Sequence, residues 1–209
     1  MKKILSCFLV CAFLCTGLYG CGSKKTELIE EAKDLTLSQE ISITPEQNDY
    51  GIPAYNFLKH IQSNYPGRVA GTEKETEMAV FILSVLLNDG YAESDIAIES
   101  FEIDDSTPMM DEAIQNVFDG GEKSNSSQKG ESEKTIIVGA HYDSAGTHGV
   151  DDNGSGVSVA LENALRMVNT PTYYTIQYVF FGSEEPGMYG SRAYVESLSE
   201  KERENIILM

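Results

Sequence analysis

The stretch Thr135-Ile136-Ile137-Val138-Gly139-Ala140-His141 is a continuous apolar run that ends in a histidine. Its length and its β-branched side chains predict a strand that is buried on both faces. A second run of aromatic and β-branched residues over 174–181 predicts another strand. Between the two, apolar residues at helical spacing predict a helix that begins near 153–156 and ends by 169. A strand, a helix and a strand in this order favour an α/β sheet with crossover helices.

The chain on either side continues this alternation of helices and strands. Apolar residues recur at helical spacing before the turn signals Pro66-Gly67 and Asp89-Gly90, and shorter apolar runs follow. The further predicted elements are helices over 52–61, 73–88 and 189–198 and strands over 96–101 and 206–209. Residues 104–133 are rich in Asp, Glu, Ser, Gly and Lys, so we assign no regular structure there, and 120–134 is typical of an exposed loop.

The charge balance of the chain is strongly acidic. Its 209 residues include 33 acidic and 15 basic side chains, which give a formal net charge of -18. This charge argues against a nucleic acid or an anionic membrane surface as partner and favours cation binding. The hydrophobic content of 41% is enough for the core of one globular domain.

The N-terminus has the pattern of an export signal. Lys2 and Lys3 precede a short apolar run over 4–18, and Leu18-Tyr19-Gly20-Cys21 resembles the lipobox of bacterial lipoproteins. We therefore expect a signal peptide over 1–20, a lipid on Cys21, a flexible acidic tether over 21–48 and a folded body over 49–209. The expected location is the outer face of a bacterial cell membrane, with an uncleaved anchor or ordinary secretion as the alternatives.

Three polar motifs follow the predicted strands and point to a metal site. All four cysteines lie within the first 21 residues, so a metal in the body of the chain must use histidine and carboxylate ligands. His141-Tyr142-Asp143 places a carboxylate two residues after an imidazole, and Gly182-Ser183-Glu184-Glu185 places two carboxylates at the end of a strand. The glycine-rich segment over 149–156 adds Asp152 at the start of a helix. Ligands bind outside the carboxyl ends of the strands in open α/β sheets, so we expect these groups to converge.

Each of these residues could instead have a role in the fold alone, without a metal ion. His141 could be a buried histidine that Asp143 satisfies. Asp152 could cap the helix that follows it, because aspartate is a good N-cap residue. The adjacent carboxylates Glu184 and Glu185 could be a solvated pair in a loop.

The motifs taken in order resemble a known family. The blocks His-Tyr-Asp-Ser over 141–144, Asp-Asp-Asn-Gly-Ser-Gly over 151–156 and Gly-Ser-Glu-Glu-Pro-Gly-Met-Tyr-Gly-Ser over 182–191 follow Gly-Arg-Val-Ala-Gly-Thr over 67–72 and Gln-Asn-Val over 115–117. This series resembles metallopeptidase family 28, the di-zinc aminopeptidases, across 50–209. The resemblance implies a three-layer zinc-peptidase fold of the phosphorylase/hydrolase-like kind, with a mixed sheet flanked by helices.

The resemblance also implies a role for each polar residue. His141 is the expected ligand of one zinc ion, Glu185 the ligand of the other, and Asp152 the carboxylate that bridges both. Glu184 is the expected general base, which takes a proton from water held by the metals and passes it to the leaving amine. Asp143 is expected to support His141. The peptide bond after Asp152 is expected to be cis.

The implied function is that of a zinc-dependent exopeptidase that removes N-terminal residues from extracellular peptides. Members of the family complete their two metal sites with a further Asp and a second His that lie beyond residue 209, so we expect a domain that is truncated at its C-terminus. Each zinc would then have two protein ligands, and we expect weak or partial zinc binding and an inactive chain. The alternatives are a non-catalytic, receptor-like module and a glutaminyl cyclase-like acyltransferase, the latter less favoured by the motif over 152–156.

Overall fold

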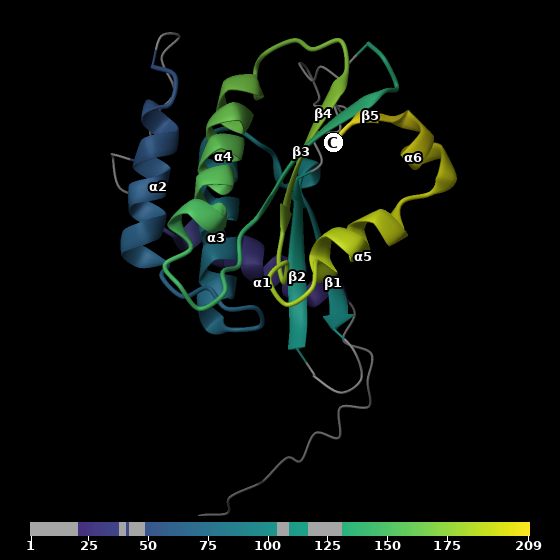
Figure 1. The fold of residues 1–209 in the computed structure, drawn as a ribbon. Coiled ribbons are helices and arrows are strands. Elements are labelled where there is room, and N and C mark those ends of the chain that lie inside the picture. The colour runs from purple at the N-terminus through teal and green to yellow at the C-terminus, as the bar shows by residue number, and fades with distance from the viewer. Residues whose placement is uncertain (1–20, 38–40, 42–48, 104–108, 117–130) are drawn as a thin grey trace, which may run out of the picture.

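The architecture is a five-stranded mixed sheet with helices on both faces (Figure 1). The computed structural model describes residues 21–37, 41, 49–103, 109–116 and 131–209. In the sheet the strand order is β1-β2-β4-β3-β5. The strands are β1 (Ala97–Ile103), β2 (Met109–Asn116), β3 (Thr135–His141), β4 (Thr175–Phe181) and β5 (Ile206–Leu208). β3 runs parallel to β4 and to β5, whereas β2 is antiparallel to both β1 and β4, so the predicted mixed α/β sheet is confirmed.

The helices form a layer on each side of this sheet. They are α1 (Cys21–Asp34), α2 (Ile52–Asn64), α3 (Glu73–Asn88), α4 (Gly156–Met167), α5 (Tyr189–Ser197) and α6 (Glu200–Asn205), with short helical turns at Glu93–Asp95 and Val150–Ser155. Figure 1 shows α2, α3 and α4 on one side of the sheet and α5 on the other. α4 packs on β3 and β4, while α5 packs on β1 and β2.

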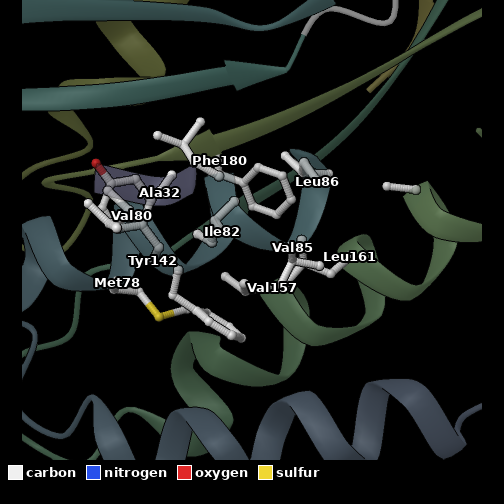
Figure 2. Packing of buried hydrophobic residues seen from close by; sticks show 14 of the residues in the cluster. Ala32, Met78, Val80, Ile82, Val85, Leu86, Tyr142, Val157, Leu161 and Phe180 are labelled. Carbon is white, nitrogen blue, oxygen red and sulfur yellow. The ribbon is translucent and has the colours of Figure 1, made fainter. Parts of the chain in front are cut away.

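α3 is the centre of the core. It packs against α1 and α4, and every residue from Met78 to Leu86 is buried. A helix that is apolar on all sides is stable only when neighbours cover each face, which is what α1, α4 and the sheet do here. Figure 2 shows Ile82 and Leu86 of α3 packed near Phe180 of β4 and near residues of α4. This core fixes the ends of β3 and β4, where the polar motifs begin.

The sequence-based prediction of a flexible tether over 21–48 differs from the structure. Residues 21–34 form α1, which buries Leu28, Ile29 and Ala32 against the core. Three apolar positions in a charged segment are too few to reveal a helix by periodicity, and packing against α3 supplies the stabilisation. The signal peptide predicted over 1–20 lies outside the described residues. Within the described part of the chain, no helix combines the length and the apolar character needed to cross a bilayer.

Two further elements escaped the sequence-based prediction. β2 lies in the acidic segment for which no regular structure was predicted, and its backbone pairs with strands on both sides, which compensates for a composition of low β propensity. The exposed loop predicted over 120–134 falls mostly outside the described residues. The second unpredicted element is α6. It begins with a capping box, in which Ser199 Oγ accepts from the N–H of Glu202 and the Glu202 carboxylate accepts from the N–H of Ser199.

Asp89, at the end of α3, gives a prediction about stability. Its Oδ2 atom is buried and has no hydrogen-bond partner among the described residues, and burial raises the pKa of this carboxyl to about 6. A raised folded-state pKa contributes stability at low pH that is lost as the pH rises from about 4 through about 6. We therefore expect Asp89→Asn to raise the free energy of unfolding at pH 7.5 by about 1 kcal/mol.

Urea denaturation at pH 7.5 and pH 4 measures this effect. Most of the gain should disappear at pH 4, where the aspartate is protonated in the folded state and the pH lies close to its unfolded-state pKa of 3.8. Asp34→Asn, at the exposed end of α1, is the matched control and should change little at either pH. An equal gain for Asp89→Asn at both pH values would contradict this explanation.

Candidate metal centre

The candidate site lies where β3 and β4 end at the same edge of the sheet. The two strands are parallel, and His141, the last residue of β3, is in register with Phe181, the last residue of β4. The loops that follow carry Asp143 and Glu184-Glu185, and the turn at Val150–Ser155 carries Asp152 at the start of α4. Parallel pairing therefore brings together motifs that lie about forty residues apart in the chain.

His141 is in contact with three carboxylates. Its Nε2 atom lies 3.0 Å from Asp152 Oδ1 and 3.9 Å from Glu184 Oε2, and its Nδ1 atom lies 3.3 Å from Asp143 Oδ1. The His141 side chain is 11% exposed, whereas that of Asp152 is 78% exposed. Nδ1 of His141 thus faces the buried carboxylate of Asp143, and Nε2 faces the exposed side of the site, where Asp152 lies.

The donor atoms of His141, Asp152 and Glu185 lie within 4.8 Å of one another. Zinc binds histidine nitrogen and carboxylate oxygen at about 2.0–2.2 Å, so two ligands of one ion are at most about 4.4 Å apart. The spacing here fits one ion after a small side-chain movement, or two ions that share Asp152. The structure thus brings together the three residues that the sequence singled out as metal ligands, and this donor set fits zinc.

Asp143 links the histidine to the loop after β4. It is fully buried, and its two oxygens accept the backbone N–H groups of Glu184 and Glu185, each at 3.0 Å. The Glu185 carboxylate in turn accepts the N–H of Ala145 at 3.0 Å. One buried carboxylate therefore holds the imidazole of His141 and both adjacent glutamates in fixed relative positions.

The charges around His141 act on its pKa in opposite directions. Burial lowers the pKa, but the hydrogen bond and charge of Asp143, the hydrogen bond of Asp152 and the charge of Glu184 outweigh it, so the pKa of His141 is raised. A metal ion binds the neutral imidazole, so protons and metal compete for Nε2 as the pH falls.

Asp152 does not cap the helix that follows it, which was the structural alternative to a role as metal ligand. The first N–H of α4, that of Gly156, is accepted by Asn153 Oδ1 at 3.0 Å, so Asn153 rather than Asp152 caps this helix end. The Asp152-Asn153 peptide bond is cis, as predicted. With the capping done by its neighbour, the Asp152 carboxylate is free to face His141.

The other two histidines lie apart from this group of donors. His60, on α2, stacks on Phe81 with 4.9 Å between ring centroids. His148 has an exposed side chain in the loop after β3, and its backbone carbonyl accepts from Arg68. Arg68 and Glu75, both buried beside the site, were not predicted to have a role there. The motif over 67–72 marks the position of Arg68, but its burial cannot be read from the sequence.

Comparison with known proteins identifies the segment that bears the site. The family model "Peptidase family M28" matches residues 124–209, which include His141, Asp152 and Glu184-Glu185. This segment belongs to peptidase family M28. The polar motifs that converge at the end of β3 and β4 are therefore in the M28 part of the chain.

Single proteins are also similar in sequence to this chain. The alkaline phosphatase isozyme conversion protein of Escherichia coli is 29% identical over 181 residues, which cover 79% of this chain and 51% of the relative. The "Probable lipoprotein aminopeptidase LpqL" of Mycobacterium tuberculosis is 45% identical over 71 residues, which cover 33% and 14% of the two chains. The chain thus spans about half the length of the first relative and a smaller part of the second.

A solved structure shares the fold. The glutaminyl cyclase of an Acidobacteriales bacterium aligns with a TM-score of 0.61 at 20% identity, over 78% of this chain and 59% of that chain. At this identity the likeness shows the fold alone. The M28 segment therefore lies in a mixed α/β fold that this cyclase shares, and a shared fold does not by itself indicate a shared activity.

Proposed function

We propose that this chain carries the active site of a zinc-dependent aminopeptidase that removes N-terminal residues from extracellular peptides. The observation that carries the proposal is the convergence of His141, Asp152 and Glu185 within 4.8 Å, with the Glu184 carboxylate 3.9 Å from the His141 ring. The match to peptidase family M28 and the name of the LpqL relative support the reaction class.

The proposed ligands are His141 for one zinc ion, Glu185 for a second and Asp152 for both. When bound, zinc polarises the scissile carbonyl and lowers the pKa of water. Asp152 suits a bridging role because its side chain is mostly exposed and points an oxygen at His141. In the proposed mechanism Glu184 takes a proton from the attacking water and gives it to the leaving amine. Asp143 keeps His141 and Glu184 in place through its three contacts.

A hydrolysis assay on the full-length gene product tests this function. Aminoacyl p-nitroanilides should be cleaved, a chelator should abolish cleavage, and zinc should restore it. N-acetylated versions of the same substrates are the control, because an aminopeptidase requires the free amine. Cleavage that survives complete removal of metal, or that is indifferent to N-acetylation, would overturn the proposal.

The same assay separates the two alternatives. A glutaminyl cyclase-like enzyme would convert a peptide with an N-terminal glutamine to the pyroglutamyl form without releasing an amino acid. A receptor-like module would bind peptide and leave it intact. Mass spectrometry of a glutamine-led peptide after incubation detects cyclisation. The same measurement on peptides with other N-terminal residues distinguishes hydrolysis from binding alone, and the proposal requires release of a free amino acid from at least one of them.

Zinc binding by the present chain gives a second prediction. The described residues supply three donors to what we propose are two ions, against roughly three protein ligands that a catalytic zinc usually has. We therefore expect the chain to bind zinc with a Kd on the order of micromolar or weaker. Isothermal calorimetry measures it directly. Submicromolar binding would show that these three residues suffice and would contradict an incomplete ligand set.

We further propose that the protein is anchored outside the cytoplasm by a lipid on Cys21. The lipobox-like stretch over 18–21 and the lipoprotein name of the LpqL relative support this location. Metabolic labelling with a radioactive fatty acid should mark the wild-type protein and leave Cys21→Ser unlabelled. Equal labelling of the two would contradict the assignment of the lipid to this cysteine.

A further inference from the structure

Two buried charged side chains, Arg68 and Glu75, lie outside the segment that the M28 family model matches. Arg68 follows α2 and is 0% exposed, and Glu75 lies in the first turn of α3 and is 2% exposed. Burying a charge is costly unless hydrogen bonds compensate it, so the partners of such groups indicate what the charge is retained for.

The Arg68 guanidinium donates to four backbone carbonyls. Nε bonds to Tyr142 O at 2.7 Å, Nη1 to Tyr65 O at 2.8 Å and His148 O at 3.1 Å, and Nη2 to Gly149 O at 2.9 Å. Three of these carbonyls belong to the loop that joins β3 to the turn at Val150–Ser155. Burial lowers the pKa of Arg68 and the charge of Asp143 opposes this.

These contacts fix the backbone on both sides of the proposed ligands. Tyr142 lies between His141 and Asp143 in the chain, and Gly149 directly precedes the turn that carries Asp152. The Arg68 backbone adds a further tie, since its carbonyl accepts the N–H of Ser144 at 2.7 Å. The packing is close as well: a Cβ at Gly149 would lie 2.6 Å from Arg68 Nη2.

Glu75 makes the corresponding contacts with the loop after β4. Its Oε1 accepts the N–H of Ser183 at 3.0 Å, and its Oε2 accepts the N–H of Gly71 at 2.6 Å. Ser183 has a left-handed φ of 49° and directly precedes Glu184. Glu75 therefore holds the residue from which the chain turns to present Glu184 and Glu185.

We infer that Arg68 and Glu75 are positioning residues for the metal centre, a role that rests on the proposed function. Arg68 holds the loop that lies between His141 and Asp152, and Glu75 holds the loop that carries Glu184 and Glu185. The two residues lie seven positions apart in one segment, 68–75, which runs from the connection after α2 into the first turn of α3. That segment thus sets the distance between the two sides of the site without contributing a ligand.

Binding of Zn²⁺ and Co²⁺ to the present chain tests the inference. Glu75→Gln and Arg68→Lys should each weaken zinc binding about 10- to 100-fold, the range for residues that orient metal ligands. They should also alter the visible absorption spectrum of the Co²⁺ form, which reports ligand geometry. Far-UV circular dichroism checks that each variant is folded, and Glu75→Gln, which keeps the size of the side chain, decides the question if Arg68→Lys does not fold.

A matched control comes from Glu162 on α4. This carboxylate is also buried and also accepts two backbone N–H groups, but these belong to Gly51 and Ala54, and Glu162 is not part of the donor group. Glu162→Gln should lower the Tm and leave the zinc affinity and the Co²⁺ spectrum unchanged. If Glu75→Gln and Arg68→Lys behave like this control, they serve stability only and the inference is wrong.

His141→Ala separates this failure from failure of the proposed function. Zinc binding that is lost in His141→Ala and retained in Glu75→Gln and Arg68→Lys would overturn the positioning role alone. Zinc binding that is unchanged in His141→Ala would instead overturn the metal centre itself.

Discussion

Replacing Glu184 with Gln in the full-length gene product should lower kcat for release of the N-terminal residue by on the order of 10³-fold, because an amide cannot take a proton from the attacking water. The zinc content should stay the same, since Glu184 is not a proposed ligand. The Glu184 backbone N–H that Asp143 accepts is retained in the variant, so the loop should keep its position. Steady-state kinetics with an aminoacyl p-nitroanilide, together with metal analysis by mass spectrometry, measures both quantities.

Glu185→Gln is the matched control for this variant. It changes the neighbouring side chain in the same way, but Glu185 belongs to the group of metal donors. The proposed roles therefore require Glu185→Gln to lower the zinc content as well as the activity. A Glu184→Gln variant that keeps more than about a tenth of the wild-type kcat would contradict the role of general base.

A large loss of zinc affinity is expected for His141→Ala. Removal of the imidazole takes away the only nitrogen donor of the group, and we expect the zinc affinity of the present chain to fall at least about 100-fold. His148→Ala is the control, because His148 has an exposed side chain in the loop that follows β3. Calorimetry on the two variants should show loss of binding in the first and unchanged binding in the second.

Equal zinc affinity in His141→Ala and the wild type would contradict the assignment of the metal centre. The fold itself should survive the substitution, because the side chain lies at the end of β3 and is not part of the apolar core. Far-UV circular dichroism on both variants confirms that any loss of binding is local.

Strong periodicity made the core elements predictable. α3 spans the residues that the apolar pattern and the Asp89-Gly90 stop indicated, and β3 and β4 lie where apolar runs predicted strands. The predicted burial of β3 on both faces is wrong, because only Ile137 and Ala140 of this strand are buried. The convergence of His141 with the carboxylates after β4 followed from a general property of parallel strands, whose carboxyl ends meet at one edge. Local pattern and topology agreed in this part of the chain.

The elements that escaped prediction depend on contacts made over long distances in the sequence. β2 has an acidic composition and becomes a strand because β1 and β4 pair with its backbone. α1 needs α3 to cover its few apolar residues. The buried positions of Arg68 and Glu75 are likewise set by partners such as Gly149 and Ser183, which lie 81 and 108 residues away in the chain.

Anomalous diffraction at the zinc absorption edge, from crystals of the zinc-loaded full-length gene product, tests the central claim most directly. The claim predicts two peaks, one beside His141 Nε2 and one beside the Glu185 carboxylate, with Asp152 in contact with both. Ordered zinc bound away from these three residues, in protein that cleaves peptides, would contradict it.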